Sequence, residues 1–226
     1  MFPVTIATTR RRLTGYGRVA LVVLLFVLAL RFLLVGAFPF VLDPSPMGFG
    51  PHFWPHRLAL LTHIGAGTTA LLLGPLQLWS GLASFRMDRH RWTGRLYAVA
   101  VVVGGLAAFY LSAFVEGVVK ALSLQGLGIA WWATTWMAYR AIRAGREIEH
   151  KHWAARSYAV TFSFVIFRLG AEAGILSYLG PNPVAVWLWV SWIAPLLVTE
   201  LLLRRPATPV IALTGSMKPQ SSASRP

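Results

Sequence analysis

Six long apolar stretches alternate with short charged segments along this chain. Each stretch has about 20 residues, the length that an α-helix needs to cross the ~30 Å hydrocarbon core of a bilayer. Inside that core every backbone N–H and C=O group needs a hydrogen-bond partner in the protein, and an α-helix provides these partners within its own segment. We therefore expect an all-α, polytopic integral membrane bundle of about six transmembrane helices.

The composition supports the same class. Hydrophobic residues make up 56% of the 226 residues and charged residues only 12%, against roughly 25% charged in an average soluble domain. The net charge of +14 would suggest nucleic-acid binding in a soluble protein. Here the basic residues lie between the apolar stretches, where they orient the helices and meet lipid headgroups. We expect the lipid bilayer as a partner and no nucleic acid.

The chain contains no cysteine, which excludes disulfides, thiolate metal sites and cysteine nucleophiles. None of the common phosphate-binding, nucleophile or zinc motifs occurs, so we predict no metal ligands and leave open whether the protein is an enzyme. Arginine greatly outnumbers lysine, a bias typical of GC-rich bacterial genomes. The expected location is therefore the inner (cell) membrane of a bacterium.

Hydropathy places the spans in one transmembrane domain, residues 19–203. A basic N-terminus, residues 1–18, precedes this domain, and a disordered tail rich in Pro, Ser and Thr, residues 204–226, follows it. The connecting segments are expected to be loops because one holds four prolines and the other two are charged; they are residues 42–57, 86–94 and 143–152. The six spans cover about 19–40, 58–85, 95–118, 121–142, 153–179 and 184–203.

The basic residues in the connecting segments and at the ends of the spans are distributed very unequally. With six spans, seventeen of them fall on the side of the two termini, and only Arg57 and Lys120 fall on the other side. Cytoplasmic segments of membrane proteins carry such an excess of Lys and Arg. Both termini are therefore expected on the cytoplasmic side.

Five ionisable residues fall in the outer half of the expected spans. A charge there costs roughly 3 kcal/mol at the bilayer centre, so each residue needs a partner. If their helices adjoin, they form one polar cluster that faces the outside; alternatively, Arg168 and Glu172 simply neutralise each other on one helix face. The five are Arg31, His63, Glu116, Arg168 and Glu172. Of these, Arg31, Arg168 and Glu172 are the candidate substrate ligands.

A second group of residues lies at the cytoplasmic ends of the third and fifth spans. Imidazoles can ligate a haem iron or pass protons, and guanidinium groups can hold haem propionates or a quinone headgroup. The alternative is a solvated pair of basic loops. No second histidine lies opposite His63 within the membrane, so any haem would lie near the cytoplasmic face or use His63 with an unusual partner. The candidate ligands for haem b or a quinone are His63, His90, His152, Arg95 and Arg156.

Three segments carry a family resemblance: THIGAGTTALLLGPLQ (62–77), HRWTGRLY (90–97) and HKHWAARSYAVTFSFVIFRL (150–169). Together they resemble the bacterial membrane family catalogued as domain of unknown function 2306, over roughly residues 58–175. In that family the segment before the positions of Arg156 and Ser157 often reads HRxWM, whereas this chain has HKHWAA. His150 is therefore an alternative counterpart to His152. The resemblance implies a membrane fold and no particular reaction.

Three functions stay open on this basis. The first is a redox-linked membrane protein that binds haem or quinone through the histidines and arginines at helix ends. The second is a transporter or channel for a small solute or for protons that uses the outer Arg, His and Glu residues. The third is a non-catalytic accessory subunit of a membrane complex.

Overall fold

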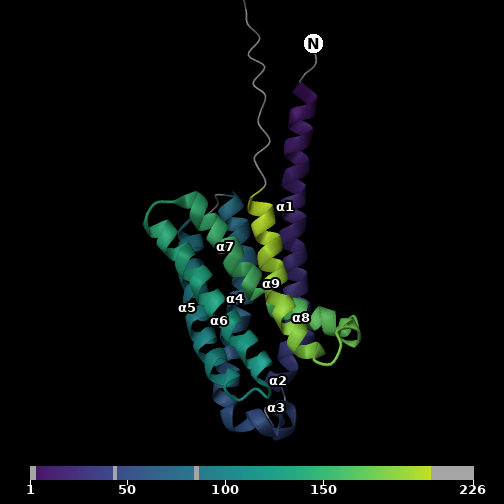
Figure 1. Ribbon diagram of the computed structural model, residues 1–226. Helices are drawn as coiled ribbons and strands as arrows, with labels where there is room; N and C mark the ends of the chain where they lie inside the picture. The colour runs from purple at the N-terminus through teal and green to yellow at the C-terminus, as the bar shows by residue number, and fades with distance from the viewer. Residues whose placement is uncertain (1–3, 43–44, 84–86, 205–226) are drawn as a thin grey trace, which may run out of the picture.

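The computed structural model describes residues 4–42, 45–83 and 87–204, and every regular element within them is helical. The longer helices form an upright bundle, and α1 extends beyond it at one end (Figure 1). These helices are α1 (Val4–Phe32), α4 (Arg57–Ala83), α5 (Met87–Ser112), α6 (Val118–Arg143), α7 (Glu147–Thr161), α8 (Ser163–Glu172) and α9 (Pro183–Leu203). The short elements are η1 (Leu33–Ala37), α2 (Phe38–Leu42), α3 (Pro46–Phe53), η2 (Trp54–His56) and η3 (Ile175–Tyr178).

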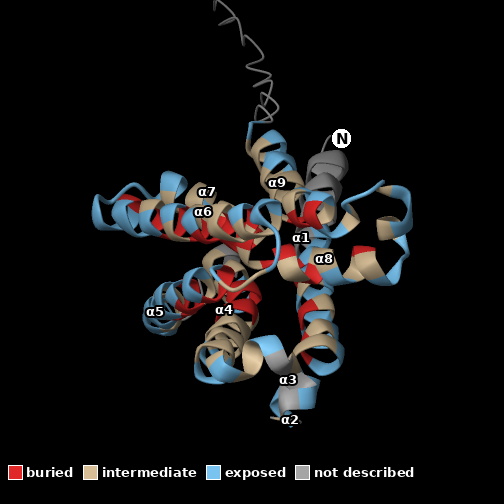
Figure 2. Cartoon of the chain, turned by 60° about the horizontal axis from the view of Figure 1, so that its bottom comes forward, coloured by how far each residue is buried: buried red, intermediate tan, exposed pale blue. Residues whose placement is uncertain are grey.

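Two helical hairpins form the centre of the bundle. α4 packs along α5, and α6 packs along α7, and buried residues line the faces that these helices turn towards one another (Figure 2). One core cluster joins all four helices; it contains Ala70, Ala100, Val101, Leu127, Trp131 and Val160. A second cluster attaches α1 through its buried residue Ala29. The outward faces carry large exposed apolar side chains, as expected of helices in contact with lipid.

Four helical segments are long and apolar enough to cross a membrane: Val19–Ala37, Trp54–Gly81, Met87–Ser112 and Pro183–Leu203. They confirm the prediction of an all-α membrane bundle and agree with four of the six expected spans. The fourth expected span is a single helix, α6, but polar residues such as Gln125 and Thr134 dilute its apolar character. The count of six spans therefore remains a prediction.

The fifth expected span, 153–179, is not one continuous helix as predicted. α7 ends at Thr161, and α8 leads away from the bundle axis towards η3 (Figure 1). At the break, the Thr161 hydroxyl donates a hydrogen bond of 2.9 Å to the Ser157 carbonyl, a contact of the kind that bends helices. The second break falls at Gly174, whose φ of 74° ends α8. Hydropathy cannot detect either break because both lie within apolar sequence.

The predicted loops are also partly wrong. Within 42–57, α3 and η2 form, because proline fits the first turn of a helix, as Pro55 does in η2. Within 86–94 and 143–152, α5 begins at Met87 and α7 at Glu147. The first turns of these two helices carry Asp88 and Glu147, and a carboxylate there is stabilised by the helix dipole. Charged ends thus extend both helices past the apolar stretches.

The ends of the transmembrane domain agree only in part with the prediction. The first apolar segment starts at Val19 as expected, but its helix already begins at Val4, within the predicted basic N-terminus. The predicted disordered tail, apart from Arg204, lies outside the described residues. For brevity, the end of the bundle that carries α3 and the α5–α6 turn is called the α3 end. The opposite end, with the α4–α5 and α6–α7 connections, is called the basic end.

Candidate functional site

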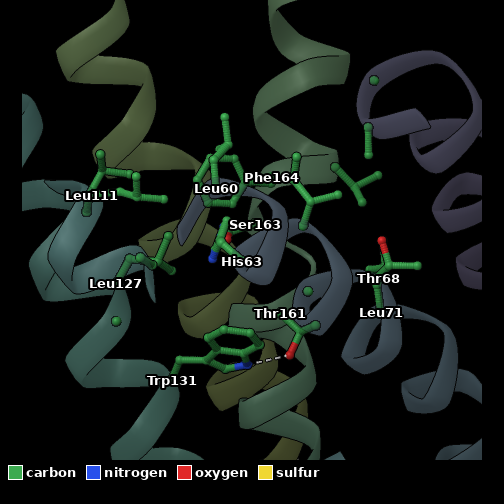
Figure 3. Close-up of a pocket in the computed structure, with 18 of the residues that line it drawn as sticks. Leu60, His63, Thr68, Leu71, Leu111, Leu127, Trp131, Thr161, Ser163 and Phe164 are labelled. Carbon is green, nitrogen blue, oxygen red and sulfur yellow. Dashed lines mark hydrogen bonds between the residues drawn. The ribbon is translucent and has the colours of Figure 1, made fainter. Parts of the chain in front are cut away.

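A cavity of about 410 Å³ lies inside the bundle, in the half towards the α3 end. Side chains from α1, η1, α3, α4, α5, α6, α7, α8 and α9 line it, and most of them are aliphatic or aromatic (Figure 3). Its volume is in the range of small-molecule pockets, which are typically ~300–1,000 Å³ and mostly apolar. This cavity is the candidate site.

Small residues on the surrounding helices keep the cavity open. Gly67 of α4 and Gly128 of α6 both line it, and a Cβ atom added at either glycine would meet no atom within 4 Å. The wall on the side of α1 is η1, a five-residue π-helix whose Leu33 and Gly36 face the cavity. Such π-helical turns within α-helices are frequent at functional sites.

His63 is the one ionisable residue among the described residues that line the cavity. Its Nδ1 lies 2.9 Å from the Gly104 carbonyl oxygen, and a carbonyl oxygen only accepts hydrogen bonds. Nδ1 therefore carries the hydrogen, and Nε2 of the neutral ring keeps a free lone pair. The ring also meets the Phe164 ring edge-on, with 6.4 Å between centroids. His63 thus offers the cavity a hydrogen-bond acceptor in a defined orientation.

A hydroxyl network in the cavity wall, which includes the lining residues Trp131 and Thr161, offers a ligand no free group. Trp131 Nε1 donates to Thr161 Oγ1 at 2.7 Å (Figure 3), and the Tyr97 hydroxyl lies 2.7 Å from the same oxygen. Tyr97 also contacts Ser157 at 2.8 Å, and Ser157 contacts Thr135 at 2.7 Å. Since Thr161 itself donates to a carbonyl, its hydrogen and both its lone pairs are in use. This network joins α5, α6 and α7 and leaves nothing for the cavity.

Two other hydroxyls are available. Thr68 and Ser163 line the cavity (Figure 3), and within the part of the chain that the structure describes neither hydroxyl takes part in a hydrogen bond. Every buried polar side-chain atom in that part has a partner, so these two oxygens are accessible from the cavity. The polar groups of the cavity are therefore one acceptor, His63 Nε2, the two unbonded hydroxyls of Thr68 and Ser163, and the Ser112 hydroxyl, which already donates to the Phe109 carbonyl.

The outer cluster predicted from the sequence forms only in part. Arg31 of α1 lies 2.5 Å from Glu172, and Arg168 lies 3.0 Å from the other oxygen of the same carboxylate. The prediction was wrong for His63, which lies in the cavity and is bonded to α5, and for Glu116, which is exposed in the α5–α6 turn. The prediction used depth alone, whereas rotation about each helix axis decides which side chains meet.

The Arg31–Glu172 pair has a structural consequence that can be measured. Replacing Glu172 with Gln should lower the melting temperature of the detergent-solubilised protein by several degrees, since two arginines then face each other and α1 loses its polar attachment to α8. Glu149→Gln is the matched control, because Glu149 pairs only with Arg146 one turn away on the surface. Equal melting temperatures for the two variants would show that Glu172 does not fasten α1.

A second ion triad at the basic end was missed by the sequence analysis. Glu200 of α9 accepts hydrogen bonds from Arg156 at 2.5 and 3.0 Å and from Arg204 at 2.7 Å. The Arg156 guanidinium also lies over the Trp153 ring, 4.6 Å from its centroid. Arg156, a candidate cofactor ligand, thus pairs with Glu200 and joins α7 to α9. The four-residue spacing of Glu200 and Arg204 was the available signal.

The cytoplasmic histidine group also assembles differently from the prediction. His90 lies beside His150, with 6.5 Å between ring centroids. His152 was a candidate ligand with His150 as its alternative, but two residues along a helix turn a side chain by roughly 200°, so His152 lies on another face of α7. Arg95 is exposed and lies outside the central cavity. Of the five candidate cofactor ligands, only His63 lines the cavity.

The other cavity residues could have been found from helical spacing. His63, Gly67 and Leu71 follow one another at four-residue intervals on α4, and all three line the cavity. Such residues lie one above another on the same helix face. Thr68, next to Gly67, falls on the edge of that face. Ser163 had no comparable signal, because its position depends on the break between α7 and α8.

Comparison with known proteins agrees with this architecture. The family described as "Predicted membrane protein (DUF2306)" matches residues 60–203. This range covers nearly all of α4 and all of α5 to α9. It therefore includes most of the residues that line the cavity, and also His63, His90 and His150. No curated protein and no solved structure matches the chain. The chain belongs to the DUF2306 family of predicted membrane proteins.

Proposed function

We propose that the protein binds a neutral, lipid-soluble molecule of the quinone class in the central cavity. The observation that carries this proposal is the combination of an apolar cavity inside a membrane bundle with a single oriented imidazole, His63. Pockets that bind small molecules typically combine a largely apolar lining with a few placed polar groups.

The lining favours a ligand without charge. Arg31, Arg168 and Glu172 do not line the cavity, and their charges are largely used in mutual pairs. An ionised ligand would enter a low-dielectric space without a counter-charge, which costs several kcal/mol. A neutral ring with an apolar tail meets no such penalty, and the bilayer itself dissolves it.

Three of these polar groups match the two oxidation states of a quinone. His63 Nε2 accepts a hydrogen bond, as the hydroxyl of a quinol requires, while the hydroxyls of Thr68 and Ser163 can donate to the carbonyl of a quinone. The contacts are few, so the apolar lining provides most of the affinity and His63 sets the orientation of the ring.

Haem fits the cavity poorly. Of the described residues that line it, His63 is the only histidine, and no lining side chain is cationic and able to meet two propionates. Transport of a small charged solute is also not favoured, because the outer Arg–Glu triad is separate from the cavity. Of the two ligands in the redox hypothesis, a quinone-class molecule is therefore preferred over haem.

The proposal includes a location and an orientation. The excess of basic residues at the basic end supports a cytoplasmic position for that end, in the cell membrane of a bacterium. The cavity then opens in the outer half of the bilayer, where a quinone headgroup near the membrane surface can enter between helices.

The test measures binding of a short-chain benzoquinol to the purified full-length protein. His63→Leu should weaken binding roughly 10-fold, because it removes one hydrogen bond worth about 1–1.5 kcal/mol and keeps the apolar volume. Thr69→Val is the matched control, since the Thr69 hydroxyl bonds only to the Gly65 carbonyl of its own helix. Unchanged affinity in His63→Leu, or no binding by the unsubstituted protein, would refute the proposal.

A further inference from the structure

A second polar cluster lies at the basic end, well away from the cavity. His90 of α5 and His150 of α7 lie side by side with their ring planes nearly perpendicular, at 88°. Both rings are partly buried. Residues from α4 and α6 supply hydrogen-bond partners to the two rings, so four helices meet at this point. Neither imidazole takes part in the proposed cavity site.

Each imidazole is oriented through its Nδ1 atom. His150 Nδ1 lies 2.9 Å from the Ala138 carbonyl oxygen, so this nitrogen carries a hydrogen and donates it. His90 Nδ1 lies 2.8 Å from the Ser80 hydroxyl. In both rings Nε2 is the nitrogen not used by these bonds. A histidine that donates its other N–H to a backbone carbonyl is the usual arrangement around a metal ion.

The spacing of the rings suits a shared ion. Metal–nitrogen bonds are about 2.0–2.1 Å long, so two imidazoles on one ion have centroids at most about 6.4 Å apart, and about 5 Å apart at a tetrahedral angle. The observed centroid separation is 6.5 Å. The two rings must therefore approach each other by roughly 1 Å to share an ion in tetrahedral geometry.

The surrounding charges are partly balanced. Arg91, next to His90, lies 3.7 Å from Asp88, and Arg146 lies 3.0 Å from Glu149. Glu147 and Glu149 belong to the first turn of α7, just before His150. These carboxylates offset part of the positive charge of the basic end, and the site is not a purely cationic surface.

We propose that His90 and His150 together bind a divalent ion of a late transition metal such as Zn²⁺. Neutral imidazole suits these ions better than it suits Mg²⁺ or Ca²⁺. The described residues contain no cluster of three or more His, Cys, Asp or Glu side chains that could hold a metal. The protein thus supplies two ligands and water supplies the others, which makes the bound ion exchangeable. This inference does not depend on the proposed function of the cavity.

The test is calorimetric titration of the full-length, chelator-treated protein in detergent with Zn²⁺ alone. We expect one ion per chain and at least a 10-fold loss of affinity in each of His90→Gln and His150→Gln, which keep a polar side chain at each position. His152→Gln is the matched control on the same helix and should bind like the unsubstituted protein. Electron paramagnetic resonance with Cu²⁺ should show hyperfine coupling to two nitrogens.

Other outcomes would overturn the inference. One is a loss of affinity in His152→Gln equal to that in His150→Gln, because a general charge effect would then explain binding. Another is unchanged binding in both pair variants together with a loss in His52→Gln, which would place the ion at the α3 end. Size-exclusion profiles and melting temperatures of all variants separate loss of ligands from loss of fold.

Discussion

Replacing Gly67 with leucine is expected to abolish ligand binding in the central cavity while the protein stays folded. Gly67 lines the cavity, and a Cβ added there meets no atom within 4 Å. The new side chain therefore extends into open space and occupies part of the roughly 410 Å³. It also fills an apolar void, which by itself favours the folded state. The measurement is binding of the short-chain benzoquinol, alongside the melting temperature.

Gly65→Leu is the control for this variant. Gly65 lies on the same helix and a Cβ there also meets no atom within 4 Å, but Gly65 is exposed on the outer face and does not line the cavity. Both substitutions raise helix propensity equally. If Gly65→Leu lost binding as completely as Gly67→Leu, the ligand would not occupy this cavity. Full binding by Gly67→Leu would lead to the same conclusion.

Replacing Gly74 with alanine is expected to be strongly destabilising. A Cβ at Gly74 would overlap ring atoms of Tyr158. Tyr158 is buried, and its hydroxyl donates a hydrogen bond of 3.2 Å to the Leu71 carbonyl, so the ring has little freedom to move. Overpacking of this kind typically costs about 1–3 kcal/mol. We expect a clear fall in the melting temperature and in folded yield.

The control is again on α4. Gly65→Ala adds the same methyl group to the outer face, where there is room for it, and gains up to about 1 kcal/mol in helix propensity. Its melting temperature should stay the same or rise. A second substitution, Tyr158→Leu, should restore part of the stability of Gly74→Ala, because it removes the overlapping ring. If Gly74→Ala melted like Gly65→Ala, the contact between α4 and α7 would be looser than it is in this structure.

The histidines show which parts of the candidate sites helical sequence patterns can predict. His63 was identified as a candidate because an ionisable residue in a long apolar stretch needs a reason to be there, and it does line the cavity. The partner of His90 could not be chosen, since His150 and His152 both stand near the start of one helix. Which of the two faces His90 depends on how α7 is rotated relative to α5, and the sequence pattern of one helix cannot predict that rotation.

The same limit applies to the ion pairs. Arg168 and Glu172 were recognisable as neighbours from their four-residue spacing alone, and the structure places them 3.0 Å apart. The third member, Arg31, lies 141 residues away from Glu172 in the chain. It joins the pair because α8 turns away from the bundle axis and passes beside α1, and this turn follows a break that hydropathy does not register.

Sequence by itself determined the class of the protein. Apolar stretches of bilayer length admit only helices because lipid offers no hydrogen-bond partners, and the distribution of basic residues predicts the orientation of these helices. The tertiary structure decided everything that depends on two helices at once: the break after Thr161, the pairing of His90 with His150, and the cavity around His63. The physical reason is that hydropathy averages over a helix, whereas a site depends on the rotation of each helix about its own axis.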